Sequence, residues 1–139
     1  MIKHIPLALY VHIPWCERKC PYCDFNSHEN FDPSLEHPYV NALLNDLEQQ
    51  LGWAEGRELV SIFFGGGTPS LFSGDAIQRI LEGIQQRLRL AEHCEITLES
   101  NPGSAEALKY DAYRHAGVNR LSIGAVSYTH LTLPTSHCV

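Results

Sequence analysis

No apolar run in this chain approaches the length of a membrane-spanning helix. The first residues, Met1–Pro6, also lack the apolar core that a secretory signal peptide needs. Ten Lys and Arg face sixteen Asp and Glu, and the formal net charge of −6 argues against a nucleic-acid-binding surface. We therefore expect a cytoplasmic protein with no transmembrane segment and no nucleic-acid partner.

Other features are missing as well. There is no internal repeat or low-complexity tract, and 139 residues allow one domain at most. The five cysteines are an odd number, and a reducing cytosol disfavours disulfides between them. The glycine run Gly65–Gly67 is not followed by the Gly-Lys-Ser/Thr of a nucleotide P-loop. These absences exclude a disulfide scaffold and a P-loop nucleotide site.

Three of the five cysteines, Cys16, Cys20 and Cys23, lie within eight residues. Thiolates crowded in this way can converge on a soft metal. A closed zinc or iron–sulfur site normally takes four protein ligands, so three would leave one iron of a four-iron cluster open to another ligand. Two alternatives stay open at this point: a Cys3His zinc site that uses His12 or His28, and three unrelated buried cysteines.

Strand and helix patterns alternate along the chain. The strands are expected at 7–13, 59–64, 95–99 and 118–123, and the helices at 39–51, 73–88 and 104–116. Ser73 and Ser104 are the expected N-caps, and Gly52 and Gly117 are expected to end helices. Short alternating units predict an α/β fold with parallel strands and right-handed crossovers.

The unusual motifs follow three of these strands, where parallel sheets and barrels bind ligands. The cysteines follow the first strand, Gly65–Gly67 and Thr68 follow the second, and Glu99 closes the third beside Asn101. Glycines allow close backbone approach, and their amide groups can bind an anionic group. A plain strand-to-helix turn and a solvated strand-end charge are the alternatives for the glycines and for Glu99.

Two further residues are expected to be structural. His12 lies within an apolar strand and is expected to be a hydrogen-bonded core histidine rather than a ligand. Cys94 stands alone near the start of the third strand and is expected to be a buried thiol away from the motif-bearing edge.

Three longer strings carry a resemblance to a known family. They are Tyr10-Val-His-Ile-Pro-Trp-Cys16, Pro21-Tyr-Cys-Asp-Phe-Asn-Ser27 and Phe64-Gly-Gly-Gly-Thr-Pro-Ser-Leu71. Together they resemble the radical S-adenosylmethionine (SAM) superfamily, within it the oxygen-independent coproporphyrinogen III oxidase group, and within that group its heme chaperone branch. The likeness runs from residue 7 to Gly124.

The resemblance implies cofactors and site residues. In that family three cysteines hold a [4Fe-4S] cluster, and the amino and carboxylate groups of SAM chelate the fourth iron. The implied cluster ligands are Cys16, Cys20 and Cys23. The implied SAM contacts are Tyr10 and Tyr22, then Gly66, Gly67 and Thr68 at the methionine end, and Glu99 at the nucleoside side.

The resemblance also implies the first half of a partial (β/α)6, TIM-like barrel with parallel strands and outer helices. Residues 1–124 are expected to be the N-terminal part of a radical SAM core domain. Residues 125–139 match nothing expected of the family and are predicted to be a frameshifted or chimeric tail. An open half-barrel is expected to expose the apolar inner face that further strands would cover.

The resemblance is compatible with two functions, an oxidase and a heme chaperone. The oxidases of this group decarboxylate two propionate side chains by radical chemistry, and they have a longer N-terminal extension and a further cysteine where this chain has Phe25. Both departures favour a heme chaperone that binds and delivers heme, with the oxidase as the alternative and enzymatic activity uncertain. A zinc-stabilised interaction module would leave the glycine run and Glu99 unexplained. The expected partners are SAM and heme or a porphyrinogen, and the recipient hemoprotein is unknown.

Overall fold

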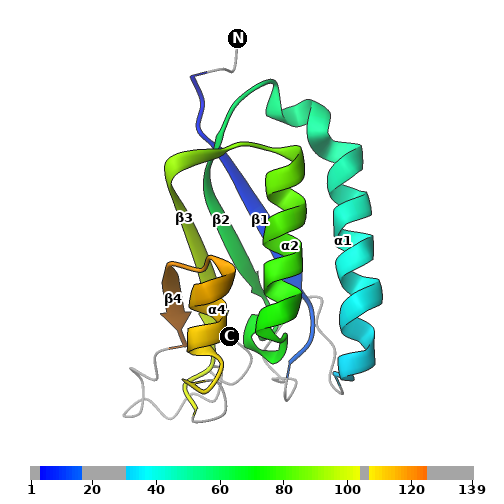
Figure 1. Cartoon of the computed structure of the whole chain (residues 1–139), viewed down its shortest axis with the longest axis vertical. Helices are drawn as coiled ribbons and strands as arrows, with labels where there is room; N and C mark the ends of the chain where they lie inside the picture. The colour runs from blue at the N-terminus through cyan, green and yellow to red at the C-terminus, as the bar shows by residue number, and fades with distance from the viewer. Residues whose placement is uncertain (1–3, 17–30, 104–106, 125–139) are drawn as a thin grey trace, which may run out of the picture.

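The computed structural model describes residues 4–16, 31–103 and 107–124. In this part of the chain a parallel sheet carries its helices on one face (Figure 1). The strands follow the order β1 (Leu7–Ile13), β2 (Leu59–Gly66), β3 (Leu90–Ser100) and β4 (Arg120–Ile123). Every neighbouring pair is parallel, so the carboxyl ends of the strands meet at one edge, at the bottom of Figure 1. The predicted α/β topology is confirmed.

The first helix, α1 (Glu36–Gln50), packs its apolar stripe on the core, with Val40 and Leu47 buried. The expected stop at Gly52 is wrong. The chain continues as a short 3-10 helix, η2 (Leu51–Ala54), and turns only at Glu55 and Gly56, whose φ angles are 50° and 79°. The left-handed backbone that reverses the chain therefore comes after Gly52.

The second helix, α2 (Gly74–Arg87), begins where the sequence predicts. The Ser73 side chain caps it by accepting a hydrogen bond from the Ala76 N–H at 3.1 Å. The third described helix, α4 (Tyr110–Ala116), ends at Gly117, whose φ is 126°. The expected cap at Ser104 lies outside the described residues, as does the predicted tail 125–139. None of the described helices is both long and apolar enough to cross a membrane.

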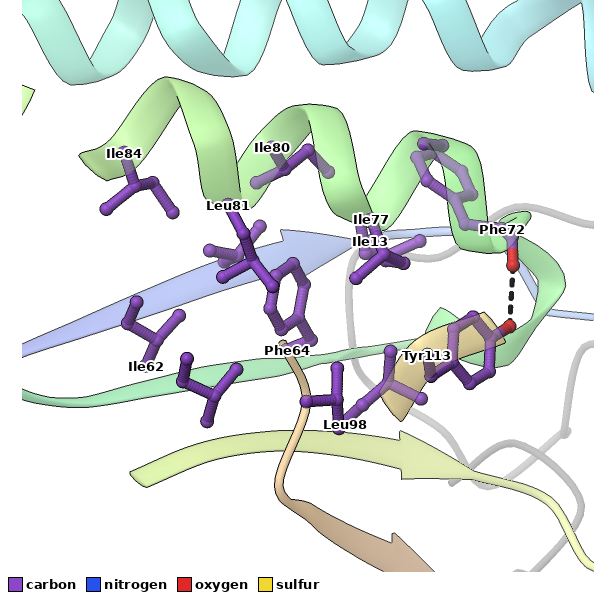
Figure 2. Packing of buried hydrophobic residues seen from close by; sticks show 14 of the residues in the cluster. Ile13, Ile62, Phe64, Phe72, Ile77, Ile80, Leu81, Ile84, Leu98 and Tyr113 are labelled. Atoms are coloured by element: carbon purple, nitrogen blue, oxygen red, sulfur yellow. Dashed lines mark hydrogen bonds between the residues drawn. The ribbon is translucent and has the colours of Figure 1, made fainter. Parts of the chain in front are cut away.

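The hydrophobic core lies between the sheet and α2 (Figure 2). Its fully buried side chains include Ile13, Ile62, Phe64 and Leu98 from the strands and Ile77, Ile80, Leu81 and Ile84 from α2. Tyr113 of α4 is also fully buried, and its hydroxyl donates to the Phe72 carbonyl at 2.6 Å (Figure 2). Burying a large apolar side chain contributes about 1.5–3 kcal/mol, so this layer fixes the helices on the sheet.

The face of the sheet away from the helices is largely polar. Side chains alternate along a strand, so Leu9 and Val11 pack toward the helices while their neighbours point the other way. The strand register aligns those outward side chains in two rows, Tyr10, Phe63, Thr97 and Arg120 in one, and His12, Gly65, Glu99 and Ser122 in the next. Phe63 is the single pure hydrocarbon side chain among them. The expected apolar inner face is therefore wrong.

Candidate functional site

The glycine turn after β2 pairs with the chain that leaves β1. The Gly67 N–H donates to the Ile13 carbonyl at 2.8 Å, and the Thr68 N–H donates to the Trp15 carbonyl at 2.6 Å. Backbone pairing between these segments thus continues beyond the end of β1. It carries Cys16, the first of the clustered cysteines, to the edge where β2 and β3 also end.

The glycines make this approach sterically possible. A Cβ on Gly67 would lie 2.6 Å from the Trp15 carbonyl carbon and 2.9 Å from the Cys16 Sγ. Gly66 has a φ of 118°, and a Cβ there would lie 2.6 Å from the Ile13 carbonyl oxygen. Side chains would force the two segments apart at both positions.

This role differs from the one expected from the sequence. The expected anion site would use the amide groups of the glycine run, but those of Gly67 and Thr68 donate to protein carbonyls. The Gly66 N–H donates to the Glu99 carboxylate. The amides of Gly67 and Thr68 therefore have partners within the protein, and the glycines contribute close packing between the two segments.

Cys16 is fully buried beside Gly67, with an exposed fraction of 0%. The other predicted residues of this loop, Cys20, Tyr22 and Cys23, lie outside the described residues. Within the described ranges, no group of three or more His, Cys, Asp or Glu side chains could hold a metal ion. Cys16 is thus the one predicted metal ligand whose position is described.

Glu99 is half-buried at the carboxyl end of β3, close to Gly65 and to the Tyr10 ring. Burial raises the pKa of Glu99, and the hydrogen bond from the Gly66 N–H opposes that rise. A raised pKa means that protonated Glu99 stabilises the folded state. This contribution to stability is fully present below the ordinary pKa of Glu and is lost as the pH rises through the raised pKa of Glu99. Burial, and then the Glu99 charge, also raises the pKa of Tyr10.

His12 is a residue of this site that the sequence reasoning misplaced. It lies on the outward face rather than in the core, and its Nδ1 is 3.1 Å from the Tyr10 hydroxyl. Its ring also borders Gly66, 2.9 Å from where a Cβ would sit. Strand alternation was the missed signal, because it puts His12 on the same face as Tyr10.

Asn101 completes the described part of the site. Its amide Nδ2 donates to the buried Thr68 hydroxyl at 3.3 Å. Its Oδ1 is buried and has no hydrogen-bond partner among the described residues. A buried acceptor without a partner costs free energy, and a bound ammonium or hydroxyl group would satisfy it.

The described residues fit the expected cofactors. The structure brings Tyr10, Gly66, Gly67, Thr68 and Glu99 together with Cys16 at one edge of the sheet. A thiol lies beside the glycine turn, and a carboxyl group, a phenol and an unpartnered amide oxygen lie nearby. This donor set suits a thiolate-bound metal next to a ligand that carries ammonium and hydroxyl groups.

Cys94 behaves as expected from the sequence. It is buried, with an exposed fraction of 6%, and burial raises the pKa of its thiol. It packs in the core on the helix side of β3, and the site residues described above lie at the carboxyl end of that strand.

Substitution of Gly67 tests the close approach of the two segments. In the full-length protein we expect Gly67→Ala to lower the free energy of unfolding by about 1–3 kcal/mol, the usual range for overpacking. The matched control is Gly52→Ala, since a Cβ on Gly52 meets nothing within 4 Å. Urea denaturation measures both variants. Equal stability of Gly67→Ala and the parent would contradict the steric role.

Comparisons with known proteins agree with this geometry. A family model for the radical SAM superfamily matches residues 10–134. The heme chaperone HemW of Escherichia coli strain K12 is 54% identical over 129 residues, which are 93% of this chain and 34% of that protein. The mitochondrial radical S-adenosyl methionine domain-containing protein 1 of Mus musculus is 43% identical over 121 residues, 86% of this chain and 27% of that protein.

A solved structure is also similar. Coproporphyrinogen III oxidase (HemN) from Escherichia coli, described as a radical SAM enzyme, superposes with a TM-score of 0.78 at 30% sequence identity. The match covers 88% of this chain and 28% of that one. The chain thus corresponds to a minor part of the length of each relative.

Proposed function

The chain belongs to the radical SAM superfamily, and we propose that Cys16, Cys20 and Cys23 hold its [4Fe-4S] cluster. The observation that carries the proposal is the buried Cys16 thiol held against Gly67. A cluster held by three thiolates supplies an electron and an open iron that SAM can chelate. We assign SAM to the end of β2, beside the glycine turn and between β1 and β3.

The neighbouring residues are assigned to SAM. Thr68 and Asn101 form a hydrogen-bonded pair beside the glycine turn, and the buried Asn101 Oδ1 accepts from the ammonium or a hydroxyl of the ligand. Glu99 accepts from hydroxyl groups on the nucleoside side, and Tyr10 lies against the ligand on the same face of the sheet. Tyr22 is assigned to the ligand from the sequence motif alone.

The whole protein is proposed to be a heme chaperone that binds heme and delivers it to a recipient hemoprotein. Support comes from the 54% identity to a protein named as a heme chaperone. Phe25 adds support, because it stands where the oxidases of the group carry a further cysteine. We also propose a cytoplasmic location, where thiolate ligands stay reduced. The heme-binding residues and the recipient are not assigned.

Removal of single cysteines tests the cluster. Anaerobic reconstitution of the full-length protein should give about four irons per chain, as the cubic cluster type requires. Cys16→Ala, Cys20→Ala or Cys23→Ala should each abolish cluster formation, and the control Cys94→Ala should leave it intact. Iron analysis and visible absorption measure the outcome. Tight zinc binding without iron uptake would instead support the zinc module.

A paired assay separates chaperone from oxidase. The full-length protein is titrated with heme, and separately incubated anaerobically with coproporphyrinogen III, SAM and a reductant. We expect saturable heme binding and no decarboxylated product, since Phe25 replaces the further cysteine of the oxidases. Multiple-turnover formation of protoporphyrinogen, detected by chromatography, would establish the oxidase instead.

A further inference from the structure

Four aromatic side chains pack together directly before Cys16 in the fold. Trp15, Phe31, Tyr39 and Phe72 form what we call the aromatic clamp. The Trp15 ring centroid lies 5.4 Å from that of Phe31, 4.8 Å from that of Tyr39 and 5.9 Å from that of Phe72. Phe72 also contacts the Phe31 and Tyr39 rings and is fully buried. Trp15 is thus held from three sides.

The clamp joins residues from separate parts of the sequence, with Phe31 a few residues before α1. Trp15 follows β1 and directly precedes Cys16, Tyr39 lies in the first turns of α1, and Phe72 precedes α2. The Tyr39 hydroxyl donates to the His12 carbonyl at 2.5 Å, which ties α1 to the last residues of β1. The Tyr113 hydroxyl holds the Phe72 carbonyl from the other side (Figure 2).

Charge-assisted hydrogen bonds also hold the starts of α1 and α2 together. The Glu36 carboxylate accepts from the Ser73 N–H at 2.6 Å and from the Ser73 hydroxyl at 2.8 Å. Ser73 is also the N-cap of α2, so the starts of α1 and α2 are held together. Hydrogen bonds to a charged acceptor are stronger than neutral ones. The segment that follows the cysteine window and the segment that follows the glycine turn are therefore joined by these hydrogen bonds.

We propose that Trp15 is a positioning residue. Its ring, locked in the aromatic clamp, holds the Cys16 thiol buried against Gly67 before any cofactor binds. This deepens the proposed function and rests on it in one respect, that Cys16 is a cluster ligand. Preorganisation of Cys16 sets where the cluster lies relative to the glycine turn, and hence how tightly SAM binds.

Thiol labelling of the full-length protein without its cofactors tests the positioning directly. The reagent is iodoacetamide, and mass spectrometry of peptides gives separate rates for Cys16 and Cys94. Both thiols are buried, so Cys94 is an internal control for general unfolding. We expect Trp15→Ala to accelerate Cys16 labelling about tenfold or more, because local opening becomes easier, while the Cys94 rate stays unchanged.

Two further variants complete the design. Trp15→Phe keeps an aromatic ring in the clamp and should restore slow labelling of Cys16. Trp53→Ala is the matched tryptophan control, since Trp53 is 75% exposed and outside the clamp, and it should change neither rate. An unchanged Cys16 rate in Trp15→Ala would overturn the proposal. If Cys94 also became fast, the milder Phe31→Leu would be judged by the same two rates, and parallel acceleration there would overturn it as well.

The reconstituted protein supplies a second readout. Trp15→Ala should keep the iron content of the parent but need about tenfold more SAM to reach half of the spectral change of the reduced cluster, a loss of about 1.4 kcal/mol of binding free energy. Parental SAM affinity in this variant would count against positioning by the clamp. Failure of the parent itself to take up iron would instead overturn the proposed function and leave the labelling result to decide on the clamp.

Discussion

The site depends on one steric constraint, the absence of a Cβ at the glycine turn. Gly66 and Gly67 let the backbone after β2 approach the backbone after β1 closely enough for Ile13 and Trp15 to accept its N–H groups. Because Cys16 is the next residue after Trp15, that pairing also fixes the first cysteine of the window. The glycine run and Cys16, which are some fifty positions apart by residue number, therefore lie side by side in the fold.

The helix side of the sheet stabilises the same edge. The Lys109 ammonium donates to the carbonyls of Ser70 and Leu71 at 2.9 and 3.2 Å, and the Tyr113 hydroxyl donates to that of Ser70 at 2.9 Å. These contacts hold the chain just after the glycine turn, where a short 3-10 helix, η3 (Pro69–Leu71), leads into α2. Hydrogen bonds to β1 and to α4 thus hold the turn from two sides. Its geometry therefore depends on tertiary contacts and not on the loop sequence alone.

The sequence predicted the α/β order, the Ser73 cap and the edge at which the motifs meet, because apolar periodicity and turn residues are local signals. It failed where the outcome depends on strand alternation or on tertiary contacts. The apolar strand predicts a core position for His12, whereas the alternation of side chains puts it on the outward face with Tyr10. The amides of the glycine run were expected to bind an anion, yet their partners are carbonyls and the Glu99 carboxylate. The alternation of side chains along the strand predicts the position of His12, but the partners of the glycine-run amides cannot be read from the spacing of residues along the chain.

The central proposal is that Cys16, Cys20 and Cys23 hold a cluster with one iron open for SAM beside the glycine turn. The most direct test of this proposal is electron–nuclear double resonance on the reduced, reconstituted full-length protein. The SAM that is added carries a nitrogen-15 label in its amino group. We expect a nitrogen hyperfine coupling that changes with the isotope, because the amino group would be a ligand of the open iron. A cluster whose spectrum shows no coupling at saturating SAM would contradict the claim.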